Sequence, residues 1–152
     1  AAEYYQKIVD GPECKANDIY LMSTKYFNVA ATSKDSVEVQ ASIEKARKYA
    51  AEANEKVPGN YRIVQQQAKV ENLAGNSAQA VKFYNETLAI LDAKENSKVE
   101  YKDIYIGVYA NLARIAFDAD DKAGAKAIYE KWLEVDPENA ALREYVENMK
   151  VD

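Results

Sequence analysis

The spacing of apolar and small residues in the last third of the chain predicts two consecutive helices. The segment YANLARIAFDADDKAGAKAIYEKWLEVDP covers residues 109–137, and apolar side chains recur in it every three or four positions, as on one face of a helix. Large side chains accompany a small one on each face, at Tyr109, Leu112 and Ala113 in the first helix and at Ala125, Tyr129 and Trp132 in the second. The acidic stretch between them is a predicted turn, with Asp120 or Asp121 as the N-cap.

Two weaker copies of this pattern lie upstream. In the second copy, YRIVQQQAKVENLAGNSAQAVKFYNETLAIL, polar Gln67 and Glu71 occupy positions where apolar residues are expected. Its packing positions are Val64, Ala68, Gly75, Ala80, Tyr84 and Leu88. The first copy has the matching residues Ile19, Met22, Ser23, Tyr26, Ala46, Ala53 and Pro58. It also carries about eleven surplus residues, roughly three turns at ~3.6 residues each, which predict an overlong second helix starting near Ser36.

The segment before the last copy, ENSKVEYKDIYI, is expected to lengthen the first helix of that copy. Ser97 and Glu100 have the spacing of a capping box, in which each side chain bonds a backbone N–H at the start of a helix.

The two ends of the chain carry further partial patterns. Asp136 is expected to cap a C-terminal helix and Pro137 to begin it, since proline lacks only an N–H that is unpaired at that position. Its packing residues would be Ala141, Tyr145 and Met149, with the charged side facing solvent. At the other end, AEYYQKIVDGP looks like the second half of another repeat, so we expect an open N-terminal end, as in a chain cut from a longer one.

Together these residues resemble the tetratricopeptide repeat (TPR), in which two antiparallel helices lock through bulky, small and aromatic residues and a closing proline. The resemblance implies an all-α, right-handed α-solenoid of antiparallel helix pairs, with about three and a half repeats and a C-terminal capping helix. Residues 1–152 would form a single domain. It would divide into a half repeat at 1–10, a degenerate repeat at 17–58, repeats at 60–93 and 97–136, and a capping helix at 137–150.

The composition gives no support for catalysis. The chain has no histidine and a single cysteine, Cys14, which excludes Ser-His-Asp and Cys-His nucleophilic sites and multi-cysteine metal centres. Cys14 is interpreted as a small apolar residue in a loop. Residues 118–121 (DADD) resemble the start of a calcium loop but lack its glycine and terminal glutamate, and no glycine-rich phosphate loop is present. We therefore expect no enzymatic activity, no metal and no cofactor.

Charge and hydropathy narrow the class of partner. The net charge of −5 argues against binding to nucleic acid, which requires a surplus of Lys and Arg. No apolar run approaches the ~18 residues of a membrane span. These features predict a soluble protein, either cytoplasmic or bacterial periplasmic, whose partner is a protein or peptide.

In the TPR family the first helix of each repeat lines a concave face, and the resemblance implies which side chains lie there. They are Asn17, Tyr20, Thr24, Phe27, Asn28, Arg62, Gln65, Gln66, Lys69, Asn72, Gly107, Ala110, Asn111 and Arg114. The amides among them can clasp a peptide backbone. The set contains the cations Arg62, Lys69 and Arg114 and no acid, which favours an acidic or extended peptide. A solvated helix face with unrelated charges is the open alternative.

TPR domains that clamp the C-terminal carboxylate of chaperones carry Lys, Asn and Arg at fixed positions. Those positions hold Tyr20, Thr24, Gln66, Gly107 and Asn111 in this chain, so that clamp is absent. The leading interpretation is a non-enzymatic protein–protein interaction scaffold. The alternatives are an oligomerisation segment that self-associates through the N-terminal end, or a regulatory module of a longer chain.

Overall fold

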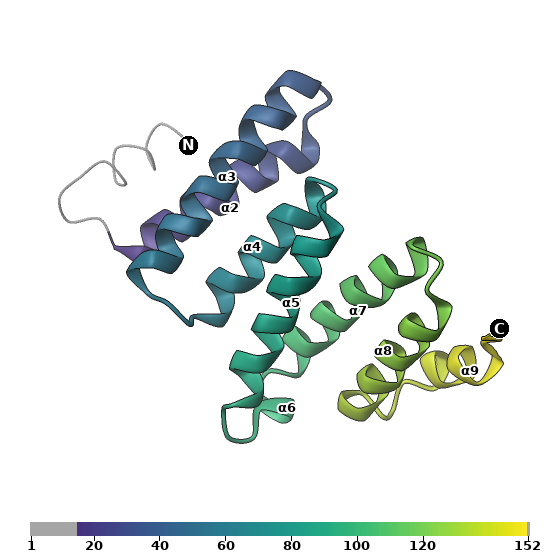
Figure 1. The fold of residues 1–152 in the computed structure, drawn as a ribbon. Helices are drawn as coiled ribbons and strands as arrows, with labels where there is room; N and C mark the ends of the chain where they lie inside the picture. The colour runs from purple at the N-terminus through teal and green to yellow at the C-terminus, as the bar shows by residue number, and fades with distance from the viewer. Residues whose placement is uncertain (1–14, 152) are drawn as a thin grey trace. The chain divides into compact units, whose positions relative to one another are not determined.

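The computed structural model describes residues 15–151, and the described chain is all-α (Figure 1). Its helices are α2 (Ala16–Thr32), α3 (Ser36–Lys56), α4 (Tyr61–Leu73), α5 (Ser77–Asp92), α6 (Ser97–Glu100), α7 (Lys102–Asp118), α8 (Lys122–Val135) and α9 (Ala140–Asn148). The fold class predicted from the sequence is confirmed. The expected half repeat at residues 1–10, together with Cys14, lies outside the described residues. Among residues 15–151, none of the helices has the length and apolar character needed to cross a membrane.

The chain divides into two compact units, the first ending at Thr87 and the second beginning at Leu88. The first unit holds α2, α3, α4 and most of α5, and the second holds the end of α5 and α6 to α9. Helix α5 therefore passes from one unit to the other without an intervening loop.

In the first unit, α3 packs against both α2 and α4, and Figure 1 shows α2 and α3 side by side. One core cluster joins Ile19, Met22, Tyr49, Ala53 and Ile63, and a second joins Ala30, Ile43, Ala46 and Val70. Helix α3 starts at Ser36, as the surplus residues predicted. The start is fixed by Asp35, whose carboxylate accepts a hydrogen bond from the N–H of Val37 at 2.9 Å.

In the second unit, α7 packs against α8, and α8 against α9. The predicted packing residues Tyr109, Leu112, Ala113 and Ala125 are all buried, the two alanines completely. Small side chains at these positions allow the helix axes to approach closely. Tyr129 of α8 meets Tyr145 of α9 edge to face, with ring centroids 5.5 Å apart.

The turns that end α4 and α7 have the same backbone geometry. Gly75 and Asp120 both adopt the left-handed conformation, with φ of 83° and 61°. In both turns the N–H of the following residue donates to the carbonyl five residues back, at 2.9 Å, which completes a Schellman motif. Asp121 then caps α8 as predicted, its carboxylate accepting from the N–H of Gly124 at 2.9 Å. The alignment of Gly75 with Asp120 in the two copies is confirmed.

The capping box expected at Ser97 and Glu100 is wrong. Both residues lie inside α6, a single turn whose N-cap is Asn96, and α7 begins separately at Lys102. The hydroxyl of Ser97 is buried and lies 3.0 Å from the hydroxyl of Tyr105, which donates to Asp92 at 2.7 Å. Ser97 is thus held by a tertiary contact. The segment does lengthen the next helix, as predicted, but only through residues 102–106, which form the start of α7.

The expected start of the C-terminal helix is also wrong. Helix α9 begins after Asn139, whose side chain accepts from the N–H of Leu142 at 3.0 Å, and Pro137 lies in the preceding turn. Asp136 cannot cap because its carboxylate accepts from the Asn139 amide at 3.1 Å and pairs with Lys102 at 3.5 Å. The hydrogen bond from Asn139 lowers the pKa of Asp136. The buried residues of α9 are Leu142 and Val146, whereas Ala141 and Tyr145 are exposed and Met149 is half-buried.

Candidate functional site

Most of the predicted binding residues lie on α2 and α4 of the first unit, two helices that contact each other. We call this surface the α2/α4 face. It comprises Asn17, Tyr20, Thr24, Phe27, Asn28, Arg62, Gln65, Lys69 and Asn72, all of them exposed or half-buried.

Two aromatic side chains anchor the α2/α4 face to the core beneath it. Tyr20 packs against the cluster that contains Ile19 and Met22, and Phe27 packs against the cluster that contains Ala30. Both rings are half-buried, so one side of each is held by the core while the other stays accessible. A ring positioned in this way loses little conformational entropy when a partner contacts it.

Gln66 does not belong to this face, contrary to the sequence-based prediction. Its side chain is buried, with 4% exposure, and its Nε2 donates to the hydroxyl of Ser23 at 3.1 Å. Ser23 in turn donates to the backbone carbonyl of Ala46 at 2.7 Å. This relay joins α4, α2 and α3, and it satisfies polar groups that would otherwise be buried without partners. The Gln66 side chain therefore links α4 to α2, the two helices that carry the face, and is not accessible to a ligand.

A pocket of about 250 Å³ opens at the end of the face where α2 and α4 begin. Asn17, Tyr20, Asn60 and Arg62 supply its polar lining, and Ala16, Val57 and Ile63 its apolar lining. The pocket brings together three predicted residues, Asn17, Tyr20 and Arg62, and none of the described residues that line it is an acid. Asn60 was missed because this residue precedes α4 and lies outside the helix faces that the repeat alignment considered. Its Oδ1 caps α4 by accepting from the N–H of Arg62 at 3.0 Å.

The α2/α4 face carries two cations, Arg62 and Lys69, and none of the residues that define the face is an acid. Arg62 rests on Tyr61, its Nε donating to the phenol at 3.2 Å and its guanidinium lying 5.8 Å from the ring centroid. Lys69 is half-buried and makes no ion pair with any of residues 15–151. The hydroxyl of Thr24 donates to the carbonyl of Tyr20 at 3.1 Å, so it can only accept from a ligand. The face therefore presents positive charge and amide groups.

In the second unit, the predicted residues Asn111 and Arg114 contact each other. Nη2 of Arg114 donates to Oδ1 of Asn111 at 2.8 Å, and Nδ2 of Asn111 donates to the carbonyl of Gly107 at 2.9 Å. Both ends of the Asn111 amide are thus engaged within α7, which leaves Arg114 as the accessible charged group. Sequence reasoning placed both residues on the correct helix but did not foresee this pairing.

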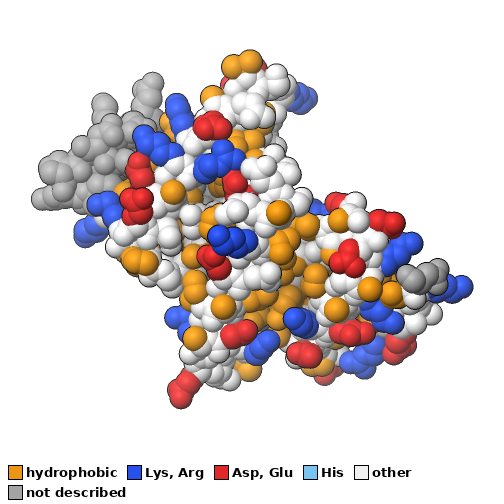
Figure 2. Space-filling model, in the orientation of Figure 1, with side chains coloured by type: hydrophobic (Ala, Val, Ile, Leu, Met, Phe, Trp, Pro, Cys, Tyr) orange, Lys and Arg blue, Asp and Glu red, His pale blue; other side chains and the backbone are white. Residues whose placement is uncertain are grey.

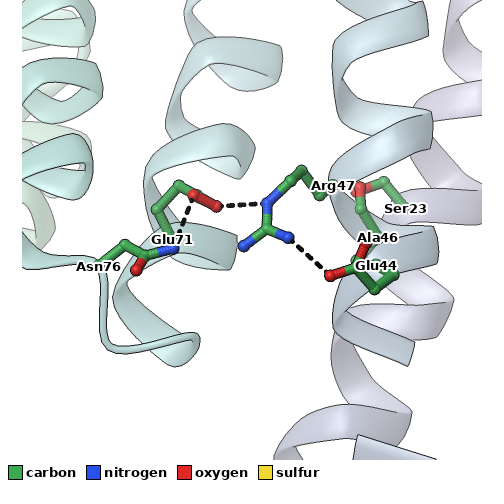
Figure 3. Close-up of polar contacts among 6 residues, drawn as sticks. All are labelled: Ser23, Glu44, Ala46, Arg47, Glu71 and Asn76. Carbon is green, nitrogen blue, oxygen red and sulfur yellow. Dashed lines mark hydrogen bonds and ion pairs between the residues drawn. The ribbon is translucent and has the colours of Figure 1, made fainter. Parts of the chain in front are cut away.

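Glu71 stood out in the sequence as an acid at an apolar position, and its environment explains it. The carboxylate is nearly buried, with 6% exposure, and accepts from Nε of Arg47 on α3 at 2.7 Å and from the Asn76 amide at 3.3 Å (Figure 3). The hydrogen bond that Arg47 donates to Glu71 raises the pKa of Arg47. Because both carboxylate oxygens have donors, the cost of burying the charge is offset.

The remaining charge is dispersed. On the face drawn in Figure 2, basic and acidic side chains alternate and do not form a patch of one sign. In the part of the chain that the structure describes, no group of three or more His, Cys, Asp or Glu is placed to hold a metal ion.

These features define a helical-repeat protein, and comparison with solved structures identifies the type of repeat. A crystal structure of a thermophilic TPR protein from Thermus thermophilus matches with a TM-score of 0.74. The match has 20% sequence identity and covers 97% of this chain and 70% of that chain. The chain therefore has the TPR fold. No protein-family model matches the sequence. No curated protein matches it either.

Proposed function

We propose that this chain is a non-enzymatic protein-interaction scaffold whose α2/α4 face binds an extended, acidic peptide segment. The fold supports this role, because stacked helical repeats commonly offer surfaces to protein partners. The observation that carries the proposal is the pocket at Asn17, Tyr20 and Arg62, where a guanidinium, an amide and a phenol converge and no described lining residue is an acid. That lining suits a carboxylate side chain, while neighbouring amides suit a peptide backbone.

The proposal is tested with a fluorescein-labelled dodecapeptide in which Glu and Leu alternate, followed by fluorescence anisotropy. Arg62→Glu and Lys69→Glu should each weaken binding about three- to fivefold, because each replaces an attraction at a partly solvated site by a repulsion. The affinity of the unmodified chain should fall as salt is added. Lys82→Glu is the matched control, since Lys82 is exposed on α5, outside the face, and its replacement changes the net charge equally.

Two results would refute the proposal. One is that Lys82→Glu weakens binding as much as the two substitutions on the face, which would mean that only net charge matters. The other is an affinity that does not change with salt.

A further inference from the structure

A second cavity lies in the first unit, away from the α2/α4 face. It has a volume of about 290 Å³ and is formed by residues of α3, α4 and the beginning of α5. None of the predicted binding residues lines it. We call it the α3/α5 cleft, and the proposed function of the α2/α4 face makes no use of it.

The floor and one wall of the α3/α5 cleft are apolar. Ala50 and Val70 lie beneath the surface of the cleft, with 0% and 1% exposure, and the accessible apolar groups are the half-buried Phe83 and the exposed Ala51. Binding pockets for complete small ligands begin at about 300 Å³, so this cleft is at the lower limit of that class. A cavity of this size suits one apolar side chain with its adjoining peptide groups better than a cofactor.

Donor groups remain unused at the polar end of the cleft. Arg47 donates from Nε to Glu71 at 2.7 Å and from Nη1 to Glu44 at 3.2 Å. Its Nη2 has no hydrogen-bond partner among residues 15–151, and Figure 3 shows this nitrogen on the Glu71 side of the guanidinium. The amides of Gln67 and Gln79 also line the cleft without a hydrogen-bond partner in the described chain.

The charges around the cleft select a neutral ligand. Glu71 and Glu44 already balance the charge of Arg47, so an incoming carboxylate would face two acids close to the arginine. An incoming cation would meet the guanidinium and compete with it for Glu71. A peptide carbonyl carries no net charge and can still accept from Nη2, so the electrostatics favour it over either ion.

We propose that the α3/α5 cleft binds a leucine-sized apolar side chain of an uncharged, extended peptide segment. The side chain lies on Phe83 and Ala51, above the buried Ala50 and Val70, and its backbone carbonyl accepts from Nη2 of Arg47. Gln67 and Gln79 pair with the adjacent peptide groups. This partner segment differs in chemistry from the acidic peptide proposed for the α2/α4 face, so the two sites can be tested independently.

The test uses N-acetyl-leucinamide as the probe and two-dimensional ¹H–¹⁵N NMR spectra of the full chain. The probe should shift the side-chain signals of Arg47 Nε–H and of the Gln67 and Gln79 amides, with a dissociation constant on the order of millimolar for so small a ligand. N-acetyl-glycinamide, which lacks the apolar side chain, should bind at least about tenfold more weakly. N-acetyl-leucine, which carries a carboxylate, should also bind more weakly.

A rim substitution gives an independent control. Ala51 lines the cleft but is itself exposed, so Ala51→Trp should fill the opening, leave the thermal midpoint nearly unchanged and abolish the shifts. Ala41→Trp is the matched variant, at an exposed position of the same helix outside the cleft, and should leave the shifts intact.

The proposal is overturned by any of three results. The first is that the unmodified chain shows no shift of these signals at tens of millimolar probe. The second is equal binding of the leucine and glycine probes, and the third is equal shifts in the two tryptophan variants. None of these results bears on the acidic-peptide experiment, so failure here leaves the proposed function standing.

Discussion

The α2/α3 pair of the first unit and the α7/α8 pair of the second both pack two helices closely together, but with different side-chain chemistry. Each places a small residue on the buried face of its first helix, Ser23 in α2 and Ala113 in α7, and both are fully buried. Ser23 donates to Ala46 and accepts from Gln66, whereas Ala113 and its counterpart Ala125 on α8 offer only methyl groups. In the first pair, directional bonds therefore add to the apolar packing between the helices, whereas the contact at Ala113 and Ala125 in the second pair is apolar. The repeat fold fixes the size of these side chains more strictly than their polarity.

The largest expected effect comes from placing a large side chain at a position of the α7/α8 pair that requires a small one. Ala125→Arg places a bulky cation where no space and no partner exist, and it should lower the free energy of unfolding by on the order of 3–5 kcal/mol. Ala127→Arg, at an exposed position of the same helix, should change it by less than about 0.5 kcal/mol. Urea denaturation followed by circular dichroism measures both. Equal stability of the two variants would show that the alignment of the repeats is wrong.

The next effect comes from removing the polar contacts of the first pair. Ser23→Ala leaves the Gln66 amide buried without its acceptor and should cost about 1–3 kcal/mol. Adding Gln66→Leu should recover much of this loss, since both polar partners are then replaced. Thr32→Ala removes an exposed hydroxyl at the end of α2 and is the control, with an expected cost below about 0.5 kcal/mol. If the double variant were no more stable than Ser23→Ala alone, the relay would not be the source of the effect.

The two units should also differ in how their stability depends on alkaline pH, because a buried tyrosine contributes in the second unit. Burial raises the pKa of Tyr105 to about 12, and its hydrogen bond to Asp92 adds to this shift. The folded-state pKa exceeds the ordinary value of 10.0, so the protonated phenol stabilises the fold. That contribution is complete below pH 10 and is lost as the pH rises from 10 to about 12. Denaturation at a series of pH values should show this loss, and Tyr105→Phe should lack the portion due to Tyr105. The cost of Ser23→Ala should not change over the same range, because Ser23 and Gln66 do not titrate.

The smallest effect concerns the two matching turns. Asp120 adopts a left-handed conformation that costs a residue with a Cβ about 1 kcal/mol. Gly75 occupies the equivalent position in the turn after α4, where the absence of a Cβ avoids this cost. Asp120→Gly should therefore stabilise the chain by about 0.5–1 kcal/mol, and Gly75→Ala should destabilise it by about 1 kcal/mol. Thermal denaturation of both variants tests this. A loss of stability in Asp120→Gly would mean that the aspartate side chain supports the turn in another way.

The elements that sequence reasoning predicted correctly depend on local signals. The start of α3 at Ser36 followed from the length of the insertion, and the buried faces of α7 and α8 followed from helical spacing. The errors arose where a side chain that could cap a helix is instead bound by other residues of the fold. Ser97 resembles a cap, but its hydroxyl is held at Tyr105, and Asp136 resembles a cap but is held by Asn139 and Lys102.

The candidate site was predictable to a similar degree. Alignment identified the helices and most of the exposed positions, because these follow from the helical period. It could not decide that Gln66 points inward, since a polar residue at the border of two faces can turn either way until its partner is known. The signal was present in hindsight: a serine on the packing face of α2 requires a buried partner, and Gln66 provides it. Arg47, the partner of Glu71, lies 24 positions away and has no local signature.

The bond between Ser23 and Gln66 also constrains how this sequence can diverge. Replacing either residue alone leaves the polar group of the other buried without a partner and lowers the stability of the fold. Replacing both together avoids this loss. Descendants of this chain should keep both residues or exchange both, and the two positions should vary together among its relatives.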